Sequence, residues 1–407
     1  MATSIAILGC GVVGSGVHEV LTANAASISE KVGDEILVKK ILDIRDFTGH
    51  EYEHLFTKDF EEILNDSEIK VVAEVIGGVE PAYTFTKKAL MNGKSVVTSN
   101  KELVAKKGAE LLQIASENNV HYMFEASVGG GIPIIRPMSR CLAANNISEI
   151  MGILNGTTNY ILTEMFKKGK SFEAALKDAQ DKGYAERNPA ADVEGIDACR
   201  KISILSDIVS GHEVNSDNVY TEGITNISSE DIKYVESIDC VLKLVAVGRM
   251  CDERVFARVS PLIIPGNHPL SVIEGVFNGV VITGDATGDV MFYGKGAGKL
   301  PTASAVVADI IDIVRTPDVP SIKWTATSDK NFMVDISETS SKFFVRAKNL
   351  TADAAANIFG QCNVLDLSIN RELAFVTREI NEAEFIDRKN DAVANGAEFV
   401  SVIRKID

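Results

Sequence analysis

The stretch SIAILGCGVVG, residues 4–14, decides the first part of the fold. Its apolar run, Ser4–Leu8, predicts a strand, and the glycines after it predict a turn into a helix that continues to about Ala25. In a strand–helix context such glycines permit a tight turn, close approach of the backbone to a pyrophosphate, and close packing of the helix on the strand. The pattern predicts a dinucleotide-binding turn, with a ligand-free turn as the alternative. Its candidate contacts are Gly9, Gly11, Val12, Val13 and Gly14.

Strands and helices alternate through the first 130 residues. Apolar runs predict strands at Ile36–Leu42, Ile69–Ile76, Ser95–Thr98 and Val120–Phe124, and helical periodicity predicts helices at 81–92 and 101–118. Strands separated by helices are typical of a parallel, doubly wound sheet. The sequence therefore predicts an α/β fold with a Rossmann-type domain over residues 1–130, completed by a helix at 301–314.

Residues 131–300 have a different pattern, which predicts an α+β substrate-binding and dimerisation domain with a second sheet. The expected strands are 147–154, 241–247, 255–259 and 279–283, and the expected helices are 159–167 and 172–181. A glycine-rich turn is expected at Gly294–Leu300.

A linker is expected at 315–330, because this segment is polar and contains Pro317 and Pro320. Residues 331–407 then follow the order strand-helix-strand-strand-helix-strand, which predicts a ferredoxin-like domain. The expected elements are 342–347, 352–359, 364–369, 373–377, 381–389 and 399–403.

Charge and composition exclude several classes of protein. The formal net charge of −16 over 407 residues implies no large basic surface, which disfavours nucleic acid and anionic membranes as partners. The sequence lacks an uninterrupted apolar run of about 18 residues, and its N-terminus lacks the basic region of a signal peptide. The six cysteines are scattered, and the six histidines show no metal-ligand spacing. We therefore expect a reduced, cytoplasmic protein.

Proton-transfer chemistry is indicated by GYAERNPAADVEGIDACRK, residues 183–201. Asp197 and Lys201 lie four residues apart and share one face of a predicted helix, with Glu186 and Asp192 shortly before them. A lysine beside carboxylates can have its proton affinity tuned for acid–base work. The same spacing is typical of an exposed ion pair on a helix, so spacing alone leaves both interpretations open.

Polar side chains also follow the ends of two predicted strands. Asp43, Arg45 and Asp46 follow the second strand, where an acid would hold a ribose hydroxyl and an arginine a 2′-phosphate. The cofactor is therefore expected to be NAD or NADP, and solvated loop charges are the alternative. Ser99 and Lys101 follow the strand at 95–98, and strand ends in such sheets face the ligand crevice. Lys101 is a candidate for contact with a substrate carboxylate or for positioning the hydride acceptor. An ordinary lysine at a helix start is the alternative.

Two loops have the composition of binding sites. In EASVGGGIP, residues 125–133, exposed carbonyls together with Glu125 would suit a hard monovalent cation, and a flexible turn is the alternative. In LNGTTNYIL, residues 154–162, Thr157 or Thr158 is expected to cap a helix or to bind a polar amino-acid substrate.

Together these motifs resemble the homoserine dehydrogenase family. The matching pieces occur in the family's order over residues 4–314: GCGVVGSGV, TSNKELVA, EASVGGGIPIIRP, ILNGTTNYIL, GYAERNPAADVEGIDACRKISIL and GKGAGKLPTASAVVADI. The resemblance implies oxidation of L-homoserine to L-aspartate 4-semialdehyde by NAD(P)+, and the reverse reduction, in threonine, methionine and isoleucine biosynthesis. It also implies a homodimer or homotetramer.

The resemblance assigns roles to individual residues. Lys201 matches the proton-transferring lysine, and Lys101 matches a lysine that lines the substrate and nicotinamide. Substrate-binding carboxylates are implied at Glu186, Asp197 and Asp192. Cofactor contacts are implied at Arg45, Ser99, Lys101, Gly183 and Gly298, in addition to the glycine turn. A structural sodium ion is implied, held by Glu125 and the carbonyls of Val128, Gly130 and Ile132.

Three positions depart from the family pattern. Asn188 stands where the family often has aspartate, and Lys295 replaces a common proline. The C-terminal domain resembles an ACT regulatory domain in element order, but KNLTADAAA, residues 348–356, replaces the Asp-x-Pro-Gly turn of threonine-regulated members. Threonine feedback and a purely dimerising role both stay open. Another amino-acid dehydrogenase of the same layout and a nonenzymatic amino-acid sensor are the alternative functions.

Overall fold

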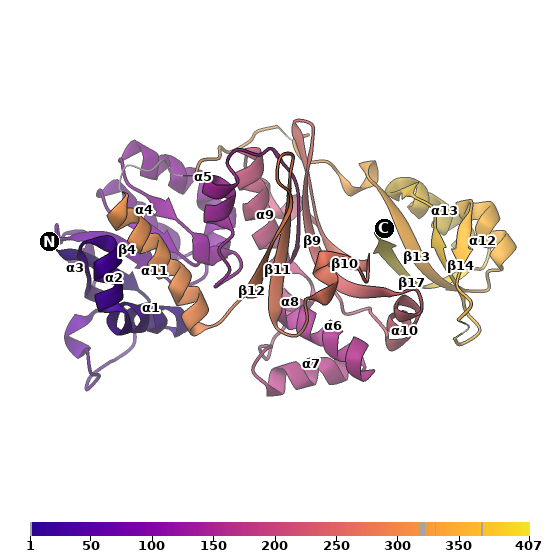
Figure 1. The fold of residues 1–407 in the computed structure, drawn as a ribbon, viewed down its shortest axis with the longest axis horizontal. Coiled ribbons are helices and arrows are strands. Elements are labelled where there is room, and N and C mark those ends of the chain that lie inside the picture. The colour runs from indigo at the N-terminus through magenta and orange to yellow at the C-terminus, as the bar shows by residue number, and fades with distance from the viewer. Residues whose placement is uncertain (1, 317–321, 330, 368) are drawn as a thin grey trace. The chain divides into compact units, whose positions relative to one another are not determined.

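The computed structural model describes residues 2–316, 322–329, 331–367 and 369–407 (Figure 1). The chain forms two compact units, each assembled from separate stretches of sequence. The first comprises Met1–Asn146, Ser203–Asp217 and Phe292–Asp329, and the second comprises Ile147–Ile202, Asn218–Met291 and Lys330–Asp407. Pro317 and Pro320 of the predicted linker lie outside the described residues. The division into three domains stays a prediction.

The first unit is built on a sheet in the order β3-β2-β1-β4-β5-β6. Its neighbouring strands are parallel, which confirms the predicted α/β architecture. The strands are β1 Ala2–Leu8, β2 Glu35–Leu42, β3 Phe56–Thr57, β4 Ile69–Glu74, β5 Ser95–Thr98 and β6 Tyr122–Met123. The central strands are almost fully buried, as expected for apolar runs covered on both faces.

The helices of this unit are α1 Val12–Ala23, α2 Ala25–Val32, α3 Phe60–Leu64, α4 Ala82–Met91, α5 Lys101–Glu117 and α11 Lys299–Arg315. Helix α11 lies against α1 although nearly three hundred residues separate them (Figure 1). A Cβ atom on Gly16 would lie 2.9 Å from the carbonyl oxygen of Lys299, so this contact requires glycine. Val17, Val306 and Ile310 belong to the same buried cluster as the strand residues Ile5 and Ile7.

Two boundaries in this part of the chain were predicted wrongly. The helix expected to reach Ala25 ends at Ala23, and α2 begins after a short break at Asn24. The turn expected at Gly294–Leu300 is strand as far as Lys295, because β12 extends over Gly288–Lys295. Strand β12 lies at the end of its sheet and has no buried residue, and its last residues, Gly294 and Lys295, have the composition of a turn.

The second unit contains most of a mixed sheet in the order β12-β11-β7-β9-β10-β17-β13-β15-β14. The strands are β7 Ile147–Ile153, β8 Tyr220–Thr221, β9 Cys240–Cys251, β10 Arg254–Pro265, β11 Phe277–Gly284, β13 Ser340–Lys348, β14 Cys362–Val364, β15 Leu373–Thr377, β16 Ile380–Asn381 and β17 Glu398–Lys405. The helices are α6 Gly156–Lys168, α7 Phe172–Asp181, α8 Ala190–Val193, α9 Ile196–Ser210, α10 Ser229–Ser237, α12 Ala352–Phe359 and α13 Glu382–Ala394. The last residues of α9 belong to the first unit.

Short helical turns complete the chain: η1 Glu53–Leu55, η2 Glu125–Ser127, η3 Pro137–Cys141, η4 Ser216–Asn218, η5 Pro269–Val272 and η6 Ile336–Glu338. In the part of the chain that the structure describes, no helix is long and apolar enough to cross a bilayer.

The C-terminal strands join the second unit's sheet through a short parallel pairing of β17 with β10, at Leu262 and Ile263. The strand expected at Val364–Ile369, of which residue 368 lies outside the described residues, was placed wrongly. Strand β14 ends at Val364, and the chain then turns through Asn370 and Arg371, which both have positive φ, before β15 begins. The turn residues decide this boundary, and apolar content alone does not reveal them.

Candidate active site

Lys201 and Asp197 form a buried ion pair one turn apart on α9. Lys201 Nζ lies 2.7 Å from Asp197 Oδ2, and it also donates a hydrogen bond to the carbonyl oxygen of Leu154 at 2.7 Å. Lys201 is 7% exposed and Asp197 6%, so the interpretation as an exposed surface pair is wrong. Burying an ion pair costs desolvation energy, so the pair is weak evidence of a role in stability. Its burial therefore favours a chemical role.

Asn155 joins this pair to a second carboxylate. Its side-chain nitrogen donates to Asp192 Oδ1 at 2.7 Å and to Asp197 Oδ2 at 2.8 Å. Its side-chain oxygen accepts from the N–H of Thr158, so Asn155 is the N-cap of α6. The prediction that Thr157 or Thr158 caps this helix was therefore wrong. Thr157 lies inside the helix and its hydroxyl donates to the carbonyl of Tyr184.

Sequence reasoning missed Asn155, although a signal was present. Asparagine is among the preferred N-cap residues, and Asn155 directly precedes α6, which begins at Gly156 and not at Asn159 as expected. Its two carboxylate partners lie 37 and 42 residues further along the chain, beyond the reach of local spacing rules. Burial and the charge of Asp197 raise the pKa of Asp192, and the hydrogen bond from Asn155 opposes that shift.

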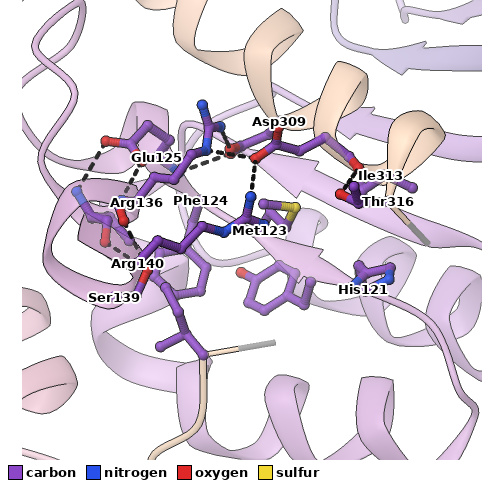
Figure 2. A pocket seen from close by; sticks show the side chains of 14 residues that line it. His121, Met123, Phe124, Glu125, Arg136, Ser139, Arg140, Asp309, Ile313 and Thr316 are labelled. Carbon is purple, nitrogen blue, oxygen red and sulfur yellow. Dashed lines mark hydrogen bonds and ion pairs between the residues drawn. The ribbon is translucent and has the colours of Figure 1, made fainter. Parts of the chain in front are cut away.

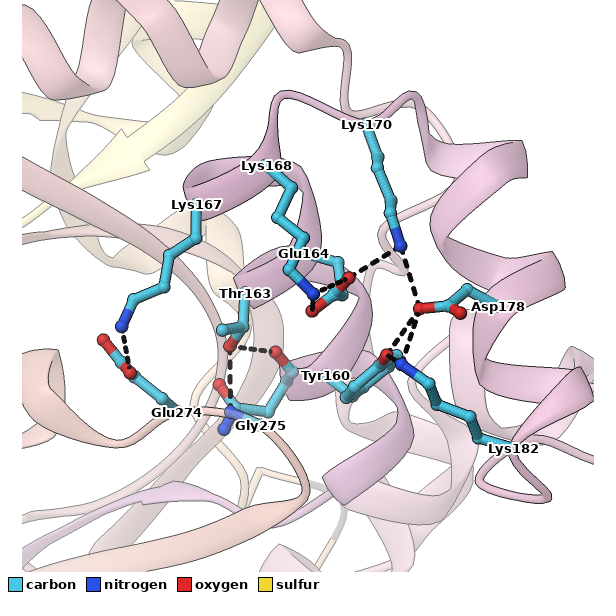
Figure 3. Close-up of polar contacts among 11 residues, drawn as sticks. Tyr160, Thr163, Glu164, Lys167, Lys168, Lys170, Asp178, Lys182, Glu274 and Gly275 are labelled. Atoms are coloured by element: carbon cyan, nitrogen blue, oxygen red, sulfur yellow. Dashed lines mark hydrogen bonds and ion pairs between the residues drawn. The ribbon is translucent and has the colours of Figure 1, made fainter.

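The loop that carries Gly183 and Glu186 is fixed from the side of α6 and α7. Figure 3 shows Asp178 accepting hydrogen bonds from the Tyr160 hydroxyl at 2.5 Å, Lys170 at 2.9 Å and Lys182 at 3.0 Å. The ring of Tyr184 packs edge-on against Tyr160, with the centroids 5.1 Å apart. Gly183 has φ of +73°, a conformation that favours glycine. Glu186 is exposed, and its backbone carbonyl accepts from Gln180 at 3.1 Å.

The glycine turn in the first unit has the geometry of a phosphate cradle. Gly9 has φ of +96°, and a Cβ on Gly14 would lie 1.9 Å from the Gly9 carbonyl oxygen, so neither position accepts a side chain. Gly11 caps α1 without a side-chain bond, which leaves the first N–H groups of that helix for an anion. Val12 is 68% exposed at the same turn, and Val13 is partly buried. These residues fit the pyrophosphate of a dinucleotide.

Asp43 and Arg45 lie beside this turn and bind each other. Asp43 Oδ2 accepts from the N–H of Cys10 at 2.7 Å, and Arg45 Nη2 donates to the Cys10 carbonyl at 2.7 Å. The side chain of Arg45 holds the pKa of Asp43 well below its usual range. Both residues therefore contact the cofactor turn, and Arg45 is the more exposed of the two.

Lys101 is the first residue of α5 and sits at a network that joins two strand ends. The buried Glu74 accepts from the Thr98 hydroxyl at 2.6 Å and from the N–H of Ile76 at 2.8 Å, and burial raises its pKa. Asn100 caps α5, and its side-chain nitrogen donates to the carbonyl of Gly78 at 2.6 Å. Ser99 and Lys101 are partly buried at this edge of the sheet.

Glu125 is held by backbone groups. Its buried carboxylate accepts from the N–H groups of Ile134 at 2.6 Å, Ile135 at 3.0 Å and Arg136 at 2.7 Å. It borders a cavity of about 430 Å³, in which Arg136 pairs with Asp309 at 2.6 Å, and Arg136 and Arg140 both pair with Asp312 (Figure 2). Burial and the charge of Glu125 raise the pKa of Asp309 to about 7, against the effect of Arg136.

The candidate residues thus form separate groups. In the second unit the structure brings together Asn155, Asp192, Asp197 and Lys201, with Glu186 exposed on a nearby stretch of chain. The first unit contains the other candidates. These are the glycine turn with Arg45, Lys101 after the end of β5, Gly298 before α11 with φ of +126°, and the loop of Glu125, Val128, Gly130 and Ile132.

Comparisons with known proteins point to one family. The sequence model described as homoserine dehydrogenase matches residues 133–311, and the one described as homoserine dehydrogenase, NAD binding domain, matches residues 9–125. The homoserine dehydrogenase of Neisseria gonorrhoeae is 41% identical over 85% of this chain and 81% of its own length. That of Synechocystis is 43% identical over 77% of this chain and 74% of its own.

Solved structures agree. A homoserine dehydrogenase from Thiobacillus denitrificans matches with a TM-score of 0.92 and 35% identity, covering 100% of this chain and 99% of that one. A hyperthermophilic archaeal homoserine dehydrogenase mutant in complex with NADPH matches with a TM-score of 0.67 and 30% identity, over 79% of this chain and 99% of that one.

Proposed function

Because this chain belongs to the homoserine dehydrogenase family, we propose that it oxidises L-homoserine to L-aspartate 4-semialdehyde with NAD(P)+ and catalyses the reverse reduction. The observation that carries the proposal is the buried cluster of Lys201, Asp197, Asn155 and Asp192. Oxidation of an alcohol by hydride transfer needs a base at the hydroxyl group, and this cluster supplies one beside two carboxylates.

Lys201 moves the proton in this proposal. In the oxidation direction its neutral amine accepts the hydroxyl proton while the adjoining carbon loses a hydride with its electron pair. In the reduction direction its ammonium group donates a proton to the carbonyl oxygen. The carbonyl of Leu154 and the carboxylate of Asp197 both accept from Nζ and so fix the position of the amine. The nicotinamide cofactor supplies the hydride acceptor or donor when bound.

The acidic residues would bind the substrate's ammonium group. Glu186 is exposed and within reach of a ligand from solution, and Asp192 and Asp197 contribute negative charge beside Lys201. We assign Lys101 to the substrate and nicotinamide. The cofactor's phosphates are assigned to Gly9, Gly11, Val12, Val13 and Gly14, and the rest of the cofactor to Arg45, Ser99, Gly183 and Gly298.

The test is a spectrophotometric assay of the purified protein with L-homoserine and each nicotinamide cofactor. We expect reduction of the cofactor with homoserine, and much weaker reduction with aspartate or a diamino acid. Stronger turnover of another amino acid would favour a related dehydrogenase. A protein that binds amino acids but reduces neither cofactor would favour a nonenzymatic sensor.

We also propose a structural sodium ion at Glu125. A carboxylate offers about four acceptor positions, and three are used by the N–H groups of Ile134, Ile135 and Arg136. The remaining position, together with the carbonyls of Val128, Gly130 and Ile132, suits a hard cation. Melting in NaCl and in choline chloride at equal ionic strength tests this. Sodium should raise the midpoint of the wild type but not of Glu125→Gln, and equal midpoints in both salts would contradict it.

For residues 331–407 we propose an ACT-like regulatory domain, and for the whole protein a homodimer or homotetramer. The strand order β17-β13-β15-β14, with helices α12 and α13, supports a ferredoxin-like arrangement. Activity measured across a threonine titration distinguishes its roles. A fall in activity supports feedback, and a flat response limits the domain to assembly, which light scattering would measure directly.

A further inference from the structure

Asn155 is the residue that contacts both acidic side chains of the catalytic cluster. It is 5% exposed, and both ends of its amide are used. The nitrogen donates to Asp192 and Asp197 at 2.7 and 2.8 Å, and the oxygen accepts from the N–H of Thr158 at 2.9 Å. The reversed orientation would turn an acceptor toward two carboxylates and a donor toward a backbone N–H, so the surroundings fix the amide.

The two residues that follow β7, Leu154 and Asn155, together contact Lys201, Asp192 and Asp197. The backbone carbonyl of Leu154 accepts a hydrogen bond from Lys201. The side-chain amide of Asn155 donates to Asp192 and Asp197. Strand β7 and the start of α6 therefore fix the positions of Lys201 and of its two acidic neighbours. Elements of this kind position reacting groups more precisely than loops do.

The two carboxylates need a donor between them. Asp192 and Asp197 carry like charges and repel each other, and burial adds to the cost of ionising Asp192. The charged groups that face Asp192 are Asp197 and Lys201, and the hydrogen bond from Asn155 acts with Lys201 to favour its ionised form. One amide that donates to both anions offsets part of their repulsion and sets their separation.

We propose that Asn155 is a positioning residue for the reaction: its amide holds Asp192 and Asp197 together and keeps Asp197 aligned on Lys201. This inference rests on the proposed function of Lys201. Asn155 acts through these neighbours, so its loss should lower turnover and move the pH profile without weakening cofactor binding.

The substitution Asn155→Ser separates this role from helix capping. Serine is also a good N-cap residue, so the start of α6 keeps its cap, while both bonds to the carboxylates are lost. We expect kcat to fall about 10- to 100-fold, because small displacements of reacting groups have effects of that size. The KM for homoserine should rise, and the Kd for NADPH should stay close to that of the wild type.

The pH profile distinguishes positioning from a purely structural role. Loss of a hydrogen bond to its ionised form raises the pKa of Asp192, so the acidic limb of kcat/KM should move to higher pH in Asn155→Ser. Asn155→Asp keeps the cap but adds a third carboxylate, and it should lower kcat further.

Asn381→Ser is the matched control. Asn381 caps α13, and its side-chain nitrogen also donates to two oxygens, the carbonyls of Ser337 and Thr339. We expect its kcat and pH profile to match the wild type. An Asn155→Ser protein with wild-type kcat and an unshifted pH profile would overturn this inference but not the proposed function. A wild type that does not turn over homoserine would overturn the proposed function, and this inference with it.

Discussion

The carboxylate of Asp43 has its acceptor positions occupied beside the cofactor turn. Oδ2 accepts from Cys10 N–H at 2.7 Å and Arg45 Nη2 at 2.8 Å, and Oδ1 accepts from the backbone N–H and Nε of Arg45, both at 3.0 Å. These four bonds use about the full capacity of a carboxylate. A ribose hydroxyl would have to displace one of them. The guanidinium of Arg45 is exposed, and its contacts with Asp43 and Cys10 use only Nε and Nη2.

Arg45→Ala should therefore change cofactor preference. We expect the KM for NADP+ to rise about 10-fold or more, the size of a lost charge-assisted hydrogen bond, because the 2′-phosphate loses its arginine. The KM for NAD+ should stay constant or fall, since Asp43 becomes available to the ribose. Steady-state kinetics with both cofactors check this. Equal changes in the two KM values would show that Arg45 does not read the 2′-phosphate.

Helix α9 connects the catalytic pair to a second buried carboxylate. Asp197 and Lys201 lie in its first two turns, and Asp207 lies near its other end. Asp207 is 1% exposed, and it accepts from the N–H of Val214 at 2.6 Å. Burial, together with the charge of Glu213, raises the pKa of Asp207 well above its usual value. The hydrogen bond from Val214 to this carboxyl group fixes the chain that follows the helix.

Asp207→Asn should remove a pH dependence of stability. A carboxyl group with a raised pKa in the folded state binds a proton there after the unfolded chain has released it, so its contribution is lost as pH rises above about 4. The free energy of unfolding of the wild type should fall relative to the variant by up to about 1.4 kcal/mol per pH unit in that window. Urea denaturation of both proteins from pH 4 to 8 measures this. Parallel curves would contradict it.

Elements with strong local signals were predicted well from the sequence. Helices α7 and α12 have the predicted bounds, and both begin after a hydroxyl N-cap residue, Ser171 and Thr351. The parallel sheet of the first unit was also predicted, because its apolar runs alternate with helical periodicity. Strand β14 was misplaced, since turn geometry sets where it ends.

The site could be predicted only in part, because spacing identifies a helix face but not what covers it. The sequence placed Asp197 and Lys201 on one face and left open whether that face is buried. Its burial depends on β7 and the start of α6, and Asn155 reaches both carboxylates only after the chain has folded. Tertiary contacts of this length have no local sequence pattern.

At the scale of the whole molecule, buried arginines connect distant segments of the second unit. Arg346 on β13 is 2% exposed; it donates to Asp231 on α10 at 2.8 Å and, through Nη2, to Glu372 at 2.7 Å. Arg404 on β17 binds both oxygens of Glu382 and also donates to Glu222. These networks tie the C-terminal segment to the preceding part of the same unit.

Arg346→Ala should strongly destabilise the second unit. Its loss leaves Asp231 and Glu372 buried without their cation, and breaking such a network costs about 3–5 kcal/mol. Lys348→Ala on the same strand is the control, because its pair with Glu398 is exposed and should contribute less than about 1 kcal/mol. Urea denaturation followed by circular dichroism measures both. Similar losses in the two variants would contradict the assignment of stability to the buried network.

The most direct test of the whole account is the turnover of Lys201 variants with homoserine. Lys201→Ala removes the proton acceptor, and Lys201→Arg keeps a cation beside Asp197 but cannot release its proton at working pH. We predict that kcat falls about 100- to 10,000-fold in both, the usual range for a lost acid–base group, while NADPH still binds with wild-type affinity. Near-normal turnover in either variant would contradict the proposed role of Lys201.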